Sequence, residues 1–253
     1  MWHYLHQWVS PKWFYYRSGR WLPWLSVMTL LTLAVGTIWG LVIAPPDYQQ
    51  HDSMRIMYVH VPAAILSESV FLLMALCSGI FLIWRIKLAD MLASVMAPFG
   101  ASMAFLALFT GAVWGIPTWG TWWTWDARLT SMLILLFLYF GVIALRGAFQ
   151  HTLAGARAAG IIALVGLVNL PVIKYSVVWW NTLHQASSFS ITHKPAMPAS
   201  MWLPLLVMVV GSYLFMATLI MMRTRSEILR REAAMAWVKT LVTHAMSKEG
   251  ASS

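Results

Sequence analysis

Long apolar stretches separated by short polar segments dominate the hydrophobic pattern of this chain. A helix needs about 20 consecutive apolar residues to cross a bilayer, and stretches of about that length occur six times. They run from Leu22 to Ile43, Val61 to Trp84, Met91 to Val113, Leu129 to Leu145, Ala158 to Val178 and Trp202 to Met222. The pattern predicts an all-α integral membrane protein in which residues 22–222 form one bundle of six transmembrane helices.

Two of these stretches are interrupted by polar or helix-breaking residues. The second contains Ser67, Glu68 and Ser69, and the fifth contains Asn169 and Pro171. We therefore expect the boundaries of these two helices to differ from the apolar limits by several residues. The aromatic and basic residues 1–21 are typical of a segment lying at the membrane interface, and residues 223–253 form a charged tail.

Composition and charge agree with a membrane protein and set its orientation. The chain is 60% hydrophobic and 10% charged, with a formal net charge of +9. Basic residues are retained on the cytoplasmic side of short loops, and with both termini in the cytoplasm 13 of the 17 Lys and Arg residues lie on that side. The four outside are Arg55, Arg128, Lys174 and Lys194. Topology and anionic lipid therefore explain the positive charge, and nucleic acid is not required.

Cysteine usage argues against a disulfide-bonded or thiol-redox protein, and the start of the chain argues against a cleaved signal. Cys77 is the single cysteine and lies within the second apolar stretch, so the chain has no disulfide framework and no CxxC redox motif. The first apolar stretch begins only after some twenty aromatic and basic residues and is long enough to span. We expect a permanent anchor there and no cleaved signal.

Three loops are predicted on the outer face, at residues 44–60, 114–128 and 175–201. Four histidines fall in them, namely His51, His60, His184 and His193, and the other four fall in cytoplasmic segments. A quinone-oxidising membrane cytochrome needs histidines inside its helices to hold haem in the bundle core. That class is disfavoured, and any chemistry is expected in the outer loops.

His60 and His184 have the positions expected of a ligand pair. His60 precedes Val61 and Pro62 at the mouth of the second stretch, and His184 follows the tryptophan pair of "WWNTLHQASSF" just beyond the fifth. Two imidazoles brought to similar depth by different helices suit axial ligation of one haem iron. Zinc is the alternative, and it would need a further ligand such as Asp126 or His193.

The outer loop "WGIPTWGTWWTWDARLT" concentrates indoles. It contains Trp114, Trp119, Trp122, Trp123 and Trp125. One interpretation is an interfacial belt facing lipid. The other is a platform that covers a planar aromatic ligand, and it is favoured because Gly115, Pro117 and Gly120 are expected to break the helix there.

Charged residues near this loop complete the predicted site. Arg55 and Arg128 are suited to bind the two haem propionates, since guanidinium binds carboxylate through two parallel hydrogen bonds. Asp126 either orients Arg128 or caps the fourth helix, and the cap is favoured. Glu68 is the one acidic residue within a span. It is either functional or hydrogen-bonded to Ser67, Ser102 or Thr110, and the sequence leaves both open.

The motifs "WGTWWTWD" and "MYVHVPAA", together with "WTWDARLTS" and the flanking His60 and His184, resemble those of the bacterial haem-handling family marked by a tryptophan-rich WWD domain. Within that family the chain is most similar to the haem exporter C group (CcmC) of cytochrome c maturation, over essentially its whole length. The tails carry no motif.

The resemblance implies that haem b is held at the outer face of the bacterial inner membrane. His60 and His184 would be its axial ligands, with the five tryptophans around the ring. It further implies transfer to the membrane-anchored haem chaperone CcmE, and a complex with the small subunit CcmD and the ABC transporter CcmA/CcmB. No nucleotide-binding motif is present in this sequence, so the ATPase would be another chain.

Three alternatives stay open at this stage. A haem permease would line a path through the bundle with polar or small residues, and few are present. A haem lyase of the WWD type would be longer, with additional histidines inside its helices. An anchor with an aromatic belt would bind no chromophore. The favoured interpretation is a binding protein and not an enzyme, although it could assist covalent attachment of haem to the chaperone.

Overall fold

The computed structural model describes residues 9–149, 152–180, 182–184 and 197–250. Within these ranges every regular segment longer than an isolated bridge is helical. The α-helices are α2 (Pro11–Ile38), α3 (Met57–Trp84), α4 (Lys87–Trp119), α5 (Ala127–Ala148), α6 (Leu153–Val165), α7 (Asn169–Trp179), α8 (Ala199–Arg231) and α9 (Ala236–Gly250). A π-helical turn, η1 (Trp39–Ile43), and two 3₁₀ turns, η2 (Asp52–Ile56) and η3 (Gly166–Val168), extend or connect them.

Six of these helical units are long and apolar enough to cross a membrane, as the sequence predicts. They are Pro11–Ile43, Asp52–Trp84, Lys87–Trp119, Ala127–Ala148, Leu153–Trp179 and Ala199–Arg231. Each contains one of the six apolar stretches and extends beyond it at one or both ends. The protein is therefore a multi-pass membrane protein built from six spans, and the all-α prediction is confirmed.

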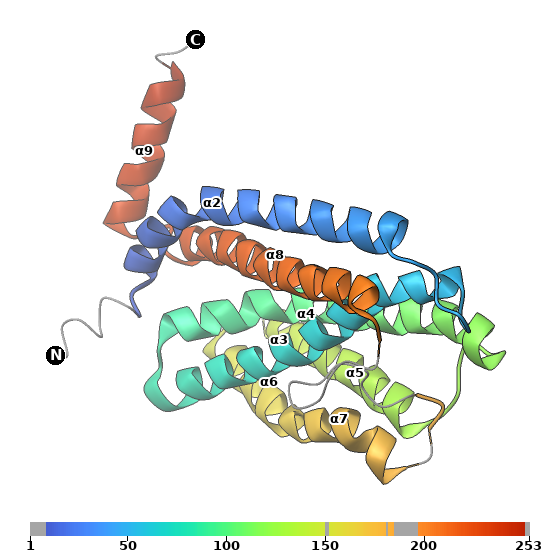
Figure 1. The fold of residues 1–253 in the computed structure, drawn as a ribbon. Helices are drawn as coiled ribbons and strands as arrows, with labels where there is room; N and C mark the ends of the chain where they lie inside the picture. The colour runs from blue at the N-terminus through green and yellow to red at the C-terminus, as the bar shows by residue number, and fades with distance from the viewer. Residues whose placement is uncertain (1–8, 150–151, 181, 185–196, 251–253) are drawn as a thin grey trace.

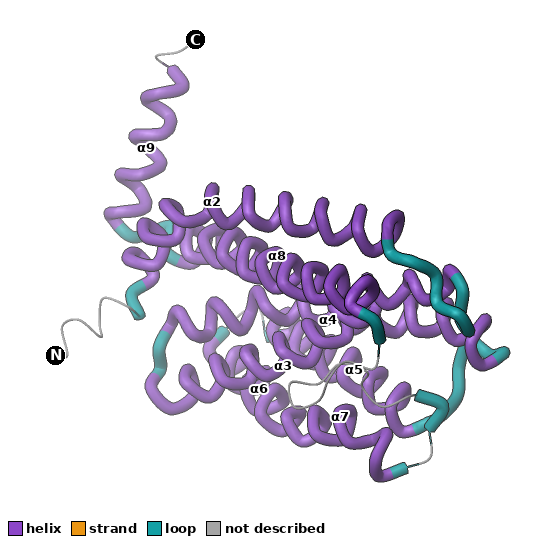
Figure 2. Tube along the Cα trace, viewed as in Figure 1, coloured by secondary structure: helices purple, strands orange, loops and turns teal. Residues whose placement is uncertain are grey.

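The spans form two groups, which Figure 1 shows side by side. Helices α2 and α8 run antiparallel to each other and cover the group formed by α3 to α7. Helix α9 projects away from the bundle beside the start of α2. The loops after η1 and α4, and residues 182–184 after α7, lie at one end of the bundle (Figure 2), which we call the site end. The turns after α3, α5 and α8 lie at the opposite end.

Small residues allow the central helices to approach closely. Helices α3 and α4 pack along each other through buried alanines such as Ala63, Ala97 and Ala104, as is usual where lipid removes the hydrophobic drive for association. A side chain at Gly100 would overlap the Tyr139 ring of α5. The Tyr139 hydroxyl donates a hydrogen bond to the Ser67 carbonyl across 2.7 Å. The core is therefore tight beneath the site end.

Helix ends differ from the predicted loops in two places that matter for the site. Helix α3 begins at Met57, so His60 lies in its first turn and not ahead of the helix. Helix α4 continues to Trp119, so the expectation that Gly115 and Pro117 break it is wrong. The helix ends at Gly120, whose φ of 74° is in the left-handed region that glycine adopts without strain.

The fifth span is broken where the sequence is irregular. Helices α6 and α7 are joined by η3, and Pro171 lies three residues further on, where it cannot donate a helical hydrogen bond. A side chain at Gly166 would come within 2.6 Å of the Phe71 ring of α3, so this turn needs glycine. Asn169 donates to the Ser131 carbonyl of α5 at 2.8 Å and fastens α7 to its neighbour.

The opposite end of the bundle contains a buried ion-pair network that the sequence did not reveal. The Asp90 carboxylate of α4 binds Arg146 of α5 at 2.7 Å and Arg231 of α8 at 2.5 Å. Arg231 also binds Glu227 at 2.6 Å. Asp90 and Arg146 are both buried. This network joins both helical groups at the end remote from the site.

Candidate functional site

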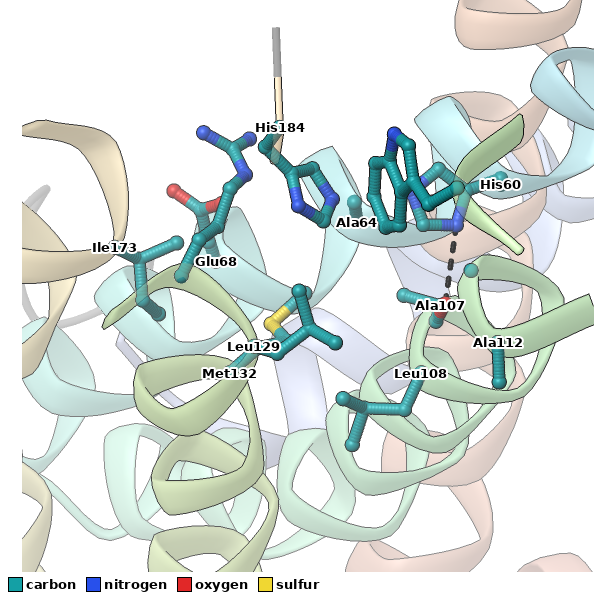
Figure 3. A pocket seen from close by; sticks show the side chains of 13 residues that line it. His60, Ala64, Glu68, Ala107, Leu108, Ala112, Leu129, Met132, Ile173 and His184 are labelled. Atoms are coloured by element: carbon teal, nitrogen blue, oxygen red, sulfur yellow. Dashed lines mark hydrogen bonds between the residues drawn. The ribbon is translucent and has the colours of Figure 1, made fainter. Parts of the chain in front are cut away.

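A pocket opens at the site end between α3, α4, α5 and the segment after α7. The space between its walls, part of it open to solvent, is about 490 Å³. His60 and His184 both line it, as do Trp119, Arg128 and Glu68. Figure 3 shows that the two imidazoles face the same pocket although they come from different parts of the chain. The structure thus brings together the two histidines that the sequence predicted as a pair.

His60 is held in one orientation by α4. Its Nδ1 atom lies 3.0 Å from the Ala107 carbonyl oxygen and 3.1 Å from Thr110 Oγ1. A carbonyl only accepts, so Nδ1 carries the proton and Nε2 keeps its lone pair. This arrangement, with one ring nitrogen fixed by the backbone, is typical of a histidine that binds a metal through the other. A side chain at Gly111 would come within 3.0 Å of His60 Cε1.

Asp126 connects the start of α5 to His184. Its Oδ1 atom accepts from the Leu129 amide at 2.8 Å, so the predicted helix cap is confirmed. Its Oδ2 atom accepts from the Thr182 hydroxyl at 2.5 Å, and that hydroxyl accepts from the His184 amide at 3.1 Å. His184 Nδ1 lies 3.8 Å from Asp126 Oδ2, too far for a hydrogen bond. It is buried without a hydrogen-bond partner among the described residues.

The surroundings of His184 favour its neutral form. Burial lowers the pKa of the imidazole from 6.5 to about 4, and the positive charge of Arg128 adds to the effect. The Asp126 carboxylate opposes it. At neutral pH the ring is therefore uncharged and one of its nitrogens has a lone pair available for a metal.

The five tryptophans do not form one platform. Trp114 lies on α4 against His60, with ring centroids 5.7 Å apart, and its indole N–H donates to Gln50 at 3.0 Å. Trp119, at the end of α4, lies against His184 at 4.7 Å. Each candidate ligand therefore has its own indole neighbour on one helix.

The other three tryptophans follow the turn at Gly120, and two of them face outward. Trp122 and Trp125 are 64% and 77% exposed. Trp123 lies between them, with centroid distances of 6.2 Å and 5.3 Å, and its buried indole nitrogen has no partner among the described residues. Together these three rings form an aromatic cluster between α4 and α5 in the chain.

The two arginines predicted as a pair are separated by the structure. Arg128 lines the pocket. Arg55 does not line it: its guanidinium binds Asp52 at 2.9 Å and the Gly40 carbonyl at 3.2 Å. Its part in ligand binding stays a prediction, and it would require the exchange of these contacts.

Glu68 faces the pocket instead of its polar neighbours. The three hydroxyls considered as its partners bond elsewhere: Ser67 to the Ala64 carbonyl, Ser102 to the Pro98 carbonyl and Thr110 to the Leu106 carbonyl. The expectation of a structural hydrogen bond from Glu68 to one of them is therefore wrong. Its carboxylate is an element of the site.

A zinc site receives no support within the described ranges. These contain no group of three or more His, Cys, Asp or Glu side chains arranged to hold a metal ion. His193, named as a possible third ligand, lies outside the described residues. Two imidazoles facing one pocket suit a metal whose remaining ligands come from its own macrocycle.

Sequence reasoning missed several residues of the site. Gln50, which binds Trp114, and Thr182, which binds Asp126, lie in predicted outer loops and belong to no motif. Glu68 had a usable signal, because it follows His60 by eight residues and Ala64 by four. That spacing places all three on one helix face, and all three line the pocket.

The fold and the pocket define a class: a six-span membrane protein with a two-histidine site covered by indoles at one end of the bundle. A profile of the family described as heme exporter protein C (CcmC) matches residues 4–239. The heme exporter protein C of Escherichia coli K12 is 50% identical over 243 residues, which cover 96% of this chain and 98% of that protein. The chain belongs to the heme exporter protein C family.

Two further relatives with the same name come from other bacteria. That of Haemophilus influenzae is 47% identical over 241 residues, covering 95% of this chain and 98% of the relative. That of Bradyrhizobium diazoefficiens is 47% identical over 223 residues, covering 88% and 84%. The similarity therefore includes the whole membrane domain and both segments that contribute the histidines.

Proposed function

We propose that this protein binds haem b at the periplasmic end of its bundle and presents it to the haem chaperone CcmE during cytochrome c maturation. The observation that carries the proposal is the pair of imidazoles, His60 from α3 and His184 from beyond α7, on one pocket. Family membership supports the haem-handling role.

The residues at the pocket fit haem. His60 offers the lone pair of Nε2, and Nδ1 of His184, which has no hydrogen-bond partner among the described residues, lies 3.8 Å from the Asp126 carboxylate. Such a carboxylate–histidine contact raises ligand basicity and fixes the ring. Haem would supply the iron that these imidazoles bind. Trp119 and Arg128, which line the pocket, would cover its apolar ring and bind a propionate.

Orientation and partners follow from charge and from family. The excess of basic residues in the segments at the opposite end supports a cytoplasmic location for that end, and so a periplasmic location for the site in a bacterial inner membrane. CcmD and the transporter CcmA/CcmB would join the same complex. The protein acts as a binding platform and not as an enzyme, and the exposed Trp122 and Trp125 offer a surface on which CcmE can reach the haem edge.

The test combines a spectrum with a binding assay. The protein purified from haem-replete cells should show a Soret band and sharp reduced α and β bands of six-coordinate haem. The periplasmic domain of CcmE should be retained by the haem-loaded protein and released by the haem-free form. A colourless protein would refute haem binding, and equal retention by both forms would refute presentation.

Acidification provides a further prediction. The deprotonated imidazole binds iron, so protons compete only below the pKa of His184, which is lowered to about 4. A histidine with pKa 6.5 would be about 90% protonated at pH 5.5. We expect the six-coordinate spectrum to persist from pH 7 to pH 5.5. Conversion to a high-spin spectrum within that range would contradict the neutral, buried ligand.

A further inference from the structure

Glu68 occupies the deep end of the pocket, on the same face of α3 as His60. The eight residues between them correspond to about 12 Å along the helix axis. Figure 3 shows the Glu68 carboxylate facing the space that the His184 ring also faces. A carboxylate in this position meets any ligand that enters between the two histidines.

Glu68 and Arg128 are unpaired within the described part of the chain. Neither side chain forms a hydrogen bond there, nor an ion pair within 4.0 Å. Both line the pocket. Arg128 is the cation that acts most strongly on Glu68, ahead of Lys174, and Lys174 is exposed. Charges in a low-dielectric site are costly unless they are paired.

We propose that Glu68 and Arg128 approach each other as an ion pair when the pocket is empty, and that a haem propionate displaces Glu68 from Arg128 when haem binds. Both side chains are long and share open space, so the exchange needs only rotations of the side chains. The inference rests on the proposed haem site and adds to it a residue that regulates how firmly haem is held.

Competition from within the pocket lowers the affinity for haem and speeds its release. When the propionate leaves Arg128, the Glu68 carboxylate neutralises the guanidinium. The haem-free state then has no unpaired buried charge, which lowers its free energy. A protein that passes its ligand to a partner benefits from this exchange. Glu68 is thus a positioning residue for Arg128, while iron ligation remains with His60 and His184.

Haem release from the full-length protein in detergent tests the exchange, with excess apomyoglobin as scavenger. We expect Glu68→Gln to release haem about tenfold more slowly than wild type, a magnitude close to the lower limit measured for close charge pairs. Glu68→Met, which is apolar and similar in length, should do the same. Glu232→Gln makes the same chemical change near the start of α9 and should leave the rate unchanged.

Two further experiments test whether the slower release depends on the haem propionate. In an Arg128→Gln background, Glu68→Gln should no longer slow release, because the competition needs the guanidinium. With haem dimethyl ester, whose propionates are blocked, wild type and Glu68→Gln should release at the same rate. An unchanged six-coordinate spectrum in each variant shows that the histidines still bind the iron.

The results separate this inference from the proposed function. If both Glu68 variants release haem as fast as wild type or faster, the inference is overturned. It is also overturned if the slower release persists with haem dimethyl ester or in the Arg128→Gln background. In those cases the proposed function is still supported if the wild-type protein binds haem. A wild type that binds no haem overturns both.

Discussion

Replacing both His60 and His184 with glycine should abolish haem binding. Each imidazole faces the pocket and has one ring nitrogen free or available for iron, and no third histidine lines the described pocket to substitute for them. The Soret band and the reduced α and β bands of the purified double variant should disappear. Retained haem with unchanged absorbance would show that the ligands are elsewhere.

The single variants make the same test more specific. His60→Gly and His184→Gly should each retain weaker, five-coordinate haem, and added imidazole should restore the six-coordinate spectrum by filling the vacated space. His244→Gly serves as the control, because His244 is exposed on α9. If imidazole rescues neither variant, the loss reflects a disturbed fold and not a missing ligand.

The second large effect concerns stability. Asp90→Asn should destabilise the protein by about 3–5 kcal/mol, because it leaves two guanidinium groups facing a buried neutral amide. Asp90 and Arg146 each have side chains only 6% exposed, and Arg231 completes the network from α8. Thermal unfolding in detergent should show a markedly lower Tm for this variant.

An exposed ion pair provides the comparison. Asp52 binds Arg55 at 2.9 Å, but its side chain is 79% exposed, and such pairs contribute about 0–1 kcal/mol. Asp52→Asn should therefore change the Tm little. Equal Tm values for the two variants would mean that the Asp90 network does not join the helical groups as its burial suggests.

The aromatic residues show what helix geometry adds to a sequence motif. The string from Trp114 to Trp125 reads as one cluster, yet the structure divides it at Gly120. Trp114 and Trp119 lie on α4 and contact one histidine each, while Trp122 and Trp125 face outward. Five residues along a helix correspond to 500°, so these two indoles point in different directions.

The sequence by itself determined the class of fold, and it predicted the pair of histidines that the structure brings to one pocket. Spanning requires an apolar run of a certain length, which is a local property, and all six runs became spans. His60 and His184 were identified because each adjoins the end of such a run. The capping role of Asp126 was equally local, since it depends on a helix starting at the next residue.

Only the tertiary structure decided which side chains meet. Asp90 and Arg231 are far apart in the chain but joined at 2.5 Å, and the Ala107 carbonyl fixes the His60 ring from another helix. Arg55 lies outside the pocket lining, where Asp52 and the Gly40 carbonyl bind it. Such contacts depend on how helices rotate and pack against each other. That packing is set by the fit of many small residues across the bundle, which no single segment encodes.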